Sequence, residues 1–418
     1  MNSARTRIYC ATSPSAVVLM AAAVEAGLVP GTGRRMLLVC DDAPVPEAAP
    51  PWDEVPGFAR LRARFDAVLS WNEAIRPFHP AAWTPRTEDV PLLERHLRRL
   101  WRLGDDRVEL ALGAPDTPPA QALARVFTGA PLHVCAGGPA DYGPTRGKLD
   151  PLIGTRVRQV MHLDLIPGLS PLLLREFGAP ARVIPVGAFR AVTGEIASAV
   201  TGILEGAALV VGERCSTEAP HAEMVRTAAG RGHHRVVFAP HPASPSRHAA
   251  ELRAEAERLG VDLTVLDTPV PVEALYEASR PALVVGRSSA ALFTASALYG
   301  LPVARVGAER LLDGLTPYHH PQRVALVLAE AVRDAAAADD LPGLLSALAF
   351  TMRPQVHPSL RADAQRYLMA GAWDRRWFPR GRLTALGLPG GVPRQLASLP
   401  RSRVARRAAR LVRRAVRG

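Results

Sequence analysis

The chain has 418 residues and 48% hydrophobic content, which is enough to bury the cores of two or three ordinary domains and excludes a small scaffold held together by disulfides or metals. Its cysteines, Cys10, Cys40, Cys135 and Cys215, are far apart and form no CxxC pair, so we expect neither a disulfide framework nor a zinc ribbon. This pattern favours a protein of the reducing cytoplasm. The net charge of +12 belongs to the C-terminal tail: residues 375–418 contain 13 arginines and no acidic residue, and the remaining 38 basic residues balance 39 acidic ones.

The N-terminus has some features of a signal peptide, because Arg5 and Arg7 precede an apolar stretch at 16–24. Residues 8–11, however, have the pattern of a strand, and Ser13-Pro14-Ser15 is typical of a turn that caps a helix. We therefore expect a folded start rather than a leader. No run of about 18 uncharged apolar residues occurs, so no membrane-spanning helix is expected.

Short β-branched runs alternate with helical patterns in the first half of the chain. Strands are predicted at residues 7–11, 36–40, 67–69, 108–112 and 131–135. The clearest helices are 15–26 and 90–102, and the second carries Leu92, Leu93, Leu97 and Leu100 on one face. This alternation favours a mostly parallel sheet covered on both sides.

A second series of the same kind begins near residue 207. Strands are predicted at 207–211, 235–239, 262–266, 282–285 and 303–306, and helices at 218–229, 248–259, 272–278 and 290–299. Two such halves joined near 187–205 predict an α/β protein with two Rossmann-like domains facing a cleft, with ligands beyond the carboxyl ends of the strands.

The rest of the chain is assigned to smaller parts. Helices are predicted at 341–351 and 359–370, and the Pro- and Gly-rich stretch 379–400 is predicted to be a linker. The expected domains are residues 1–190, residues 191–340, the C-terminal helices 341–378, and a linker with an arginine-rich tail at 379–418.

His241 follows a predicted strand and lies between Pro240 and Pro242. Proline fixes φ and removes a backbone donor, so the imidazole is held with little freedom where a phosphate would arrive. It could then offer a proton or a hydrogen bond to a leaving phosphate. The alternative is a turn histidine without a role.

Arg287, Ser288 and Ser289 follow another buried strand and begin a helix. Free N–H groups and hydroxyls at a helix N-terminus form an anion site, and Arg287 would add positive charge. The alternative is that serine simply caps the helix. Only the strand 262–266 separates this strand from the one before His241, so we expect both carboxyl ends to converge on one phosphate.

Several short motifs, in their order and spacing, resemble the bacterial alpha-2,8-polysialyltransferase-like family, relatives of the sialyltransferases with HP and SS motifs. The similarity extends over most of residues 6–330. The motifs are Leu69-Ser70-Trp71-Asn72-Glu73, Tyr142-Gly143-Pro144-Thr145-Arg146, His162-Leu163-Asp164-Leu165, Pro240-His241-Pro242, Ser288-Ser289 and Leu315-Thr316-Pro317-Tyr318.

The resemblance implies a B-type glycosyltransferase fold with the acceptor on the N-terminal domain and the nucleotide-sugar donor on the C-terminal one. It implies CMP-sialic acid as donor, a glycan hydroxyl as acceptor, and no metal or cofactor. The histidine would assist the departure of CMP and the serines would hold its phosphate. The substrate-binding residues would be Pro242, Arg287, Ser288, Ser289, Tyr142 and Arg146. The acidic pairs Asp41-Asp42, Asp105-Asp106 and Asp339-Asp340 are read as turns or caps rather than metal ligands.

The sequence departs from the family pattern at the expected catalytic base. Family members carry an acidic residue followed by glycine a few positions before Tyr142, and this chain has Gly137-Gly138. Losing a base costs roughly 10² to 10⁴ in rate. Asp141 is the nearby substitute, although it could simply cap the turn. The lysine that often precedes the Pro-His-Pro step is Ala239 here.

Two functional hypotheses follow: a working glycosyltransferase, or a family relative that binds nucleotide or glycan without turnover. A nucleic-acid binder is not expected, because no zinc finger, RNA-binding motif or aromatic interleaving accompanies the basic tail. Residues 401–418 have a basic amphipathic helical pattern, which predicts attachment to an anionic membrane and a cytoplasmic enzyme peripheral at the inner membrane face. The alternative for this tail is a solvated end.

Overall fold

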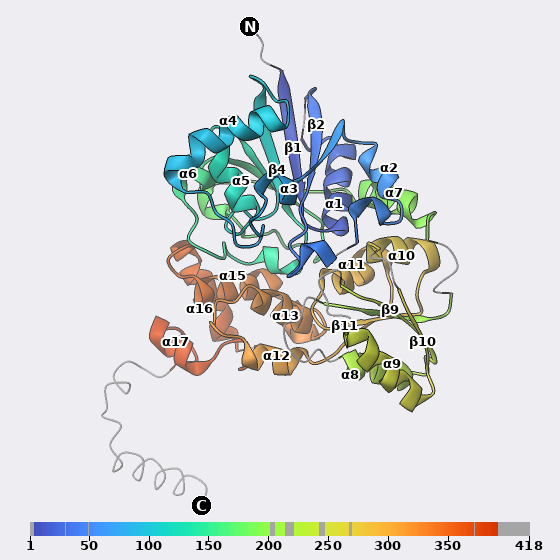
Figure 1. The fold of residues 1–418 in the computed structure, drawn as a ribbon. Coiled ribbons are helices and arrows are strands. Elements are labelled where there is room, and N and C mark those ends of the chain that lie inside the picture. The colour runs from blue at the N-terminus through green and yellow to red at the C-terminus, as the bar shows by residue number, and fades with distance from the viewer. Residues whose placement is uncertain are drawn as a thin grey trace, which may run out of the picture. The chain divides into compact units, whose positions relative to one another are not determined.

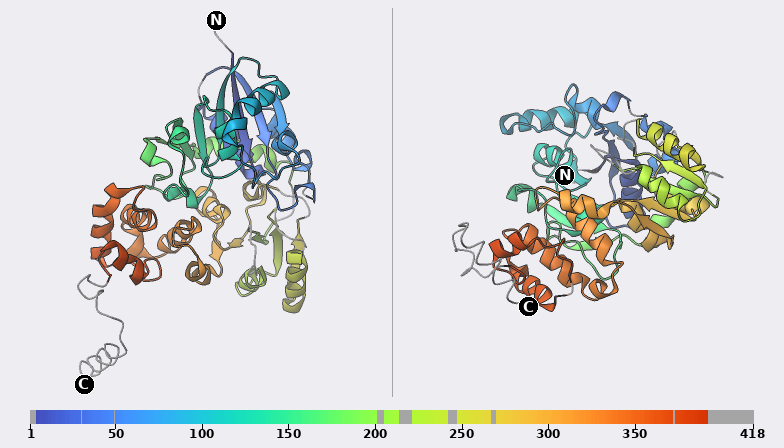
Figure 2. Two further views of the ribbon diagram at one scale, coloured as in Figure 1. Left: turned by 60° about the vertical axis from the view of Figure 1, so that its left-hand side comes forward. Right: turned by 90° about the horizontal axis from the view of Figure 1, so that it is seen from below.

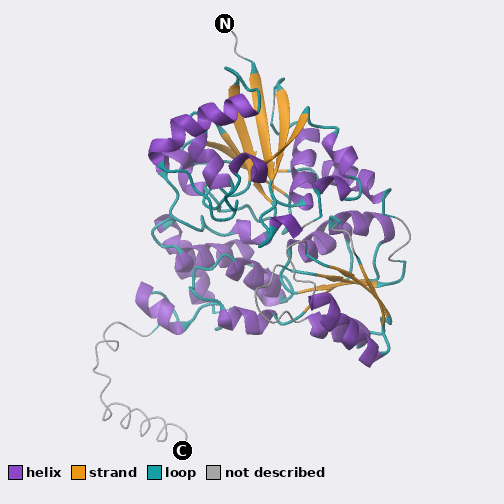
Figure 3. Ribbon diagram, in the orientation of Figure 1, coloured by secondary structure: helices purple, strands orange, loops and turns teal. Residues whose placement is uncertain are grey.

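The computed structural model describes residues 4–29, 31–48, 50–200, 205–213, 221–241, 247–266, 270–371 and 373–391. The chain divides into two compact units, residues 1–330 and 331–418. The first unit contains two parallel sheets, drawn as arrows in Figure 1 and as orange strands in Figure 3. The α/β fold with two Rossmann-like sheets, predicted from the sequence, is confirmed.

The first sheet has seven parallel strands in the order β3-β2-β1-β4-β5-β6-β7. The five strands predicted for this half are present, and the last two of the sheet were not predicted. Central strands are buried on both faces, as in a sheet covered by helices. The strands are β1 (Arg5–Ala11), β2 (Arg34–Val39), β3 (Ala67–Ser70), β4 (Arg107–Leu112), β5 (Leu132–Ala136), β6 (Val157–His162) and β7 (Ala181–Val183).

Helices cover both faces of this sheet (Figures 1 and 2). The first begins as predicted, because Ser13 accepts a hydrogen bond from the N–H of Ala16 and Pro14 occupies the first turn. The helices are α1 (Pro14–Glu25), α2 (Phe58–Arg62), α3 (Trp71–Ile75), α4 (Val90–Leu100), α5 (Ala120–Val126) and α6 (Pro151–Gly154). Short 3-10 helices lie at η1 (Pro46–Ala48), η2 (Trp52–Glu54), η3 (Thr87–Asp89), η4 (Pro139–Tyr142) and η5 (Arg175–Phe177).

The leucine face of α4 is only partly used by the core. Leu97 is buried, whereas Leu92 is 68% exposed and Leu100 is 51% exposed. Part of the apolar face predicted for α4 therefore remains exposed to solvent, because the core contacts only some of its leucines.

The second sheet has five parallel strands in the order β10-β9-β8-β11-β12. Its strands are β8 (Ala208–Val211), β9 (Arg235–Ala239), β10 (Asp262–Val265), β11 (Leu283–Gly286) and β12 (Val303–Arg305). Its helices are α8 (His221–Ala229), α9 (Arg247–Leu259), α10 (Val272–Ser279) and α11 (Ala290–Tyr299), followed by α12 (Ala308–Gly314) and α13 (Gln322–Ala331).

The segment expected to join the two halves begins with a helix, α7 (Val186–Ala197), which packs against both α1 and α10. The sequence did not predict it, because Gly187 and Gly194 lower its helix propensity. Packing of its buried face, which includes Phe189, Val192 and Ile196, overrides that propensity.

The C-terminal unit is helical, with α14 (Ala335–Ala338), α15 (Leu341–Met352), η6 (Pro358–Leu360), α16 (Arg361–Ala370) and α17 (Arg380–Leu386). The last helix corrects the prediction of a linker over 379–400. It forms because Leu383 is buried, Arg382 donates to the carbonyl of Thr351 at 2.7 Å, and Gly387 ends the helix in the left-handed conformation. Residues 392–400, like the tail, lie outside the described part.

Candidate functional site

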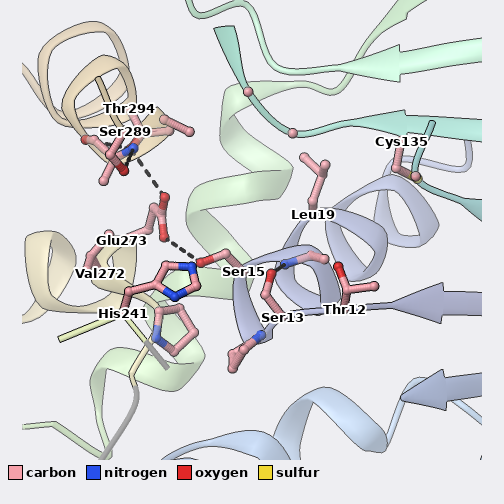
Figure 4. A pocket seen from close by; sticks show the side chains of 18 of the residues that line it. Thr12, Ser13, Ser15, Leu19, Cys135, His241, Val272, Glu273, Ser289 and Thr294 are labelled. Carbon is pink, nitrogen blue, oxygen red and sulfur yellow. Dashed lines mark hydrogen bonds between the residues drawn. The ribbon is translucent and has the colours of Figure 1, made fainter. Parts of the chain in front are cut away.

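A pocket of about 540 Å³ lies where the carboxyl ends of the two sheets face each other in the first unit. From the first sheet it is lined by the loop that leads into α1, the loop after β4, and the loop after β5 that includes Gly137, Gly138, Asp141 and Arg146. From the second sheet it is lined by the ends of β8 and β9, the start of α10 and the start of α11. Figure 4 shows this pocket from close by.

His241 lies at the pocket, two residues beyond the end of β9. Its position at the carboxyl end of a strand is the one predicted. Figure 4 shows its ring on the same side of the pocket as Ser15 and Glu273. Pro242, the other predicted residue of this motif, lies outside the described residues.

The strand that carries His241 and the strand that carries Ser288 are not neighbours, because β8 lies between β9 and β11. Neighbouring strands are about 4.8 Å apart, so the two motifs are separated by roughly twice that distance. The end of β8 lies in this gap. A Cβ on Gly212 would be 2.6 Å from the backbone nitrogen of His241, so only glycine allows this close approach.

Glu213, which directly follows Gly212, binds the other motif. One of its carboxylate oxygens accepts hydrogen bonds from the backbone N–H groups of Arg287, Ser288 and Ser289, at 3.0, 2.6 and 2.8 Å. The residue is only 7% exposed. The backbone N–H groups of this turn therefore bind an anion, which is a carboxylate of the chain itself. That they bind a phosphate stays a prediction.

The two serines have different environments. Ser289 lines the pocket, and its hydroxyl accepts from the N–H of Ala291 at 3.2 Å, so it also caps α11. Ser288 is buried; its hydroxyl lies 3.4 Å from Glu213 and 3.3 Å from the amide of Gln322. Arg287 is half-buried next to Ser288 and is not among the residues that line the pocket.

Asp141 and Arg146 both line the pocket and form an ion pair. The second carboxylate oxygen of Asp141 accepts from the N–H of Gly138 at 3.0 Å. The backbone of Arg146 is held by Asp116, which accepts from its N–H at 2.9 Å. Both oxygens of the candidate base are thus engaged, and its position is fixed.

Tyr142 is buried behind the pocket rather than in its lining. Its hydroxyl donates to the carbonyl of Leu163 at 3.2 Å and accepts from the N–H of Leu165 at 3.1 Å. Burial raises the pKa of this phenol to about 12. Two of the recognised motifs therefore meet here, and the tyrosine positions the loops that carry Asp141 and Leu163.

Glu273 lines the pocket and was not predicted from the sequence. It is 6% exposed, and it accepts from Ser15 of α1 and from Thr294 of α11, both at 3.3 Å (Figure 4). Burial raises the pKa of its carboxyl group above the ordinary value. Its apolar surroundings at the start of α10 gave no signal of a site; only the tertiary contacts reveal it.

The acidic pairs behave largely as turns and caps. The side chain of Asp41 accepts from the N–H of Ala43 at 2.9 Å. The side-chain amide of Asn72 accepts from the backbone N–H of Asp41 and donates to its carbonyl. Asp340 caps α15 through the N–H of Gly343 at 2.8 Å. Asp42, in contrast, lines the pocket. Across the described ranges, no group of three or more His, Cys, Asp or Glu side chains could hold a metal ion.

The described helices include none that is both long and apolar enough to cross a bilayer.

The model of the family described as Alpha-2,8-polysialyltransferase (POLYST) matches residues 7–308. The chain belongs to this family. The resemblance deduced from the short motifs is thereby confirmed, and the protein is a glycosyltransferase of the sialyltransferase type by family. Comparison with curated proteins gives no match.

Among solved structures, the chain is similar to MurG from Acinetobacter baumannii, with 14% sequence identity and a TM-score of 0.41, over 87% of this chain and 95% of that chain. It is also similar to the GT-B domain of a sialyltransferase from Photobacterium damselae, with 11% sequence identity and a TM-score of 0.42. That match covers 78% of this chain and 97% of that chain. A third similar structure is UDP-GlcNAc 2-epimerase from Methanocaldococcus jannaschii, with 11% sequence identity and a TM-score of 0.42. That match covers 74% of this chain and 87% of that chain.

Proposed function

We propose that this polysialyltransferase-family protein transfers a sialic acid residue from CMP-sialic acid, or a related CMP-linked donor, to a glycan hydroxyl without a metal ion. The observation that carries the proposal is the pocket itself. It brings His241 and Ser289 from the second sheet together with Asp141 and Arg146 from the first. A nucleotide-sugar donor and a glycan acceptor would each meet polar groups suited to them.

On the donor side, the phosphate of CMP would lie against His241 and Ser289. The bond between the anomeric carbon and the phosphate oxygen breaks, and CMP leaves with both electrons. An imidazole within hydrogen-bond reach assists this step by donating a proton or a hydrogen bond to the departing oxygen. Pro240 restricts the backbone on the N-terminal side of His241, so the ring presents this group with little loss of freedom.

On the acceptor side, Asp141 is the proposed base. The acceptor oxygen attacks the anomeric carbon and passes its proton to the carboxylate. The Gly137–Gly138 pair has no side chain to take this role, and η4 places Asp141 at the pocket next to the pair. Arg146 holds the carboxylate in a fixed orientation, which favours catalysis by positioning.

The same ion pair favours a second candidate function, binding of nucleotide or glycan without turnover. Both oxygens of Asp141 are already engaged by Arg146 and Gly138, so an acceptor hydroxyl would have to share an oxygen with one of these donors. In that case the pocket would still take CMP, and transfer would be absent.

Incubation with CMP-sialic acid, with and without a sialylated oligosaccharide acceptor, distinguishes sialic acid transfer from binding without turnover. Chromatography of the nucleotides and glycans measures CMP release and acceptor elongation, and EDTA is added to a parallel reaction. We expect elongation with CMP release, undiminished by EDTA. CMP binding without either product would favour the second candidate, and loss of activity in EDTA would contradict metal independence.

A further inference from the structure

The anion site at the start of α11 is occupied by Glu213. Three successive N–H groups, those of Arg287, Ser288 and Ser289, converge on one oxygen of its carboxylate at 2.6 to 3.0 Å. We call these three N–H groups the amide nest. A carboxylate with this set of donors makes charge-assisted hydrogen bonds at the positive end of a helix, as a phosphate would.

The amide nest adjoins the pocket. Ser289 supplies one of its three N–H groups and lines the pocket, and Gly212, the residue before Glu213, lines it too. Glu213 itself is 7% exposed and is not among the lining residues. The carboxylate therefore binds the amide nest from within the protein, and the donor phosphate would approach the same turn from the pocket.

The two anions compete for the same donors. An N–H group directed at the Glu213 oxygen cannot also make a full hydrogen bond to a phosphate oxygen. A phosphate held close to the carboxylate would also be repelled by its charge. With Glu213 in place, a phosphate at this turn retains His241 and the hydroxyl of Ser289, and that hydroxyl is shared with the N–H of Ala291.

Building on the proposed function, we propose that Glu213 is an internal competitor of the nucleotide phosphate. Its carboxylate holds the amide nest when the pocket is empty, and it leaves the nest when the phosphate enters. Because part of the binding energy is used to displace Glu213, CMP binds less tightly than the amide nest would otherwise allow. Return of the carboxylate then favours release of CMP after transfer.

The test is calorimetric titration of CMP, and of cytidine as the ligand without phosphate, into the full-length protein and its Glu213→Ala variant. We expect CMP to bind the variant at least tenfold more tightly than the wild type, and cytidine to bind both equally. Glu257→Ala is the matched control, because it removes an exposed carboxylate from the same half of the molecule. It should leave both affinities unchanged.

A second measurement does not depend on the identity of the donor. Inorganic phosphate should raise the melting temperature of Glu213→Ala by several degrees more than that of the wild type, because it replaces the missing carboxylate in the amide nest. If Glu213→Ala does not fold, Glu213→Gln keeps an acceptor oxygen for the amide nest without the charge, and should bind CMP about threefold more tightly than the wild type.

Unchanged or weaker CMP binding in both variants, when the wild type does bind CMP, would overturn the role of Glu213 and leave the proposed function standing. Stabilisation of Glu213→Ala by phosphate, with no CMP binding by any form, would support the role of Glu213 and contradict the CMP donor.

Discussion

Asp141 is the residue on which turnover depends in this account. It lies at the pocket beside Gly137 and Gly138, and Arg146 fixes it. Asp141→Asn keeps the shape and removes the base, so we expect transfer to fall roughly 10²- to 10⁴-fold with CMP affinity unchanged. Initial rates of acceptor elongation and a CMP titration measure the two effects. Undiminished transfer by Asp141→Asn would remove this residue from the mechanism.

Glu273 makes the stability of the folded protein depend on pH in a predictable direction. Burial raises its pKa in the folded protein, so the folded state binds this proton more tightly than the unfolded state. The stabilisation is present below the unfolded pKa, about 4.3, and is lost as the pH rises through the folded value.

Glu273→Gln should therefore gain stability relative to the wild type as the pH rises above the unfolded pKa of about 4.3. Urea unfolding at several pH values measures this difference. The control is Glu277→Gln, the same change one turn further along α10, where the carboxylate pairs with Arg190 near the surface. A Glu273→Gln difference that stays constant with pH would contradict the account.

Some residues of the site could be predicted from the sequence and others could not. The loop with His241 and the turn with Ser289 follow buried strands, a pattern that places polar groups at the edge of a parallel sheet. Glu213 could not be found in this way, because its contact depends on the strand order, which puts β8 between the two motifs. Glu273 depends on packing between α1, α10 and α11.

At the scale of elements, the end of β8 links the two donor-side motifs. Gly212→Ala would place a methyl group 2.6 Å from the backbone nitrogen of His241. We expect a loss of stability on the order of 1–3 kcal/mol and weaker CMP binding, because the loop with His241 must shift. Thermal unfolding and calorimetry measure both effects.

Gly194→Ala is the matched control, since its Cβ would meet only Glu277 at 3.9 Å, an ordinary contact. This helical substitution should stabilise the protein by about 0.5–1 kcal/mol. If Gly212→Ala is as stable and as active as the wild type, the close approach of β8 and the His241 loop is not required.

Elements with strong periodicity were predictable, and weakly patterned ones were not. The five predicted strands of the second sheet and the helix that becomes α1 follow from their apolar runs and the Ser13 cap. β7 has only three residues, all exposed, and β6 contains Arg158 and Gln159, so neither has a buried-strand pattern. β6 forms because it pairs with β5, and β7 forms at the edge of the sheet because β6 offers it free backbone groups.

At the scale of the whole molecule, the charge of the C-terminal tail bears on where the protein acts. We propose that the positive charge of residues 401–418, which lie outside the described part, attaches a cytoplasmic protein to the inner membrane face. Each arginine near an anionic surface contributes about 1 kcal/mol. α4 also exposes apolar and basic side chains together. These are Leu92 and Leu100, with Arg95 and Arg99 between them in sequence.

We expect the full-length protein to sediment with anionic liposomes at low salt and a form ending at Gly391 to sediment less. High salt should release the full-length protein, because the attraction is chiefly electrostatic. Equal sedimentation of the two forms would exclude the tail as the attachment segment, and binding only by way of α4 would then be tested with Leu92→Ser and Leu100→Ser.

The most direct test of the central claim is a calorimetric titration of CMP into the wild type, His241→Ala, and the Ser288→Ala, Ser289→Ala double variant. We predict that the wild type binds CMP and that both variants bind it at least tenfold more weakly, because each variant loses a side-chain group that would contact the phosphate. A wild type that does not bind CMP, or variants that bind it with unchanged affinity, would contradict the assignment of this pocket to the nucleotide of a sialyl donor.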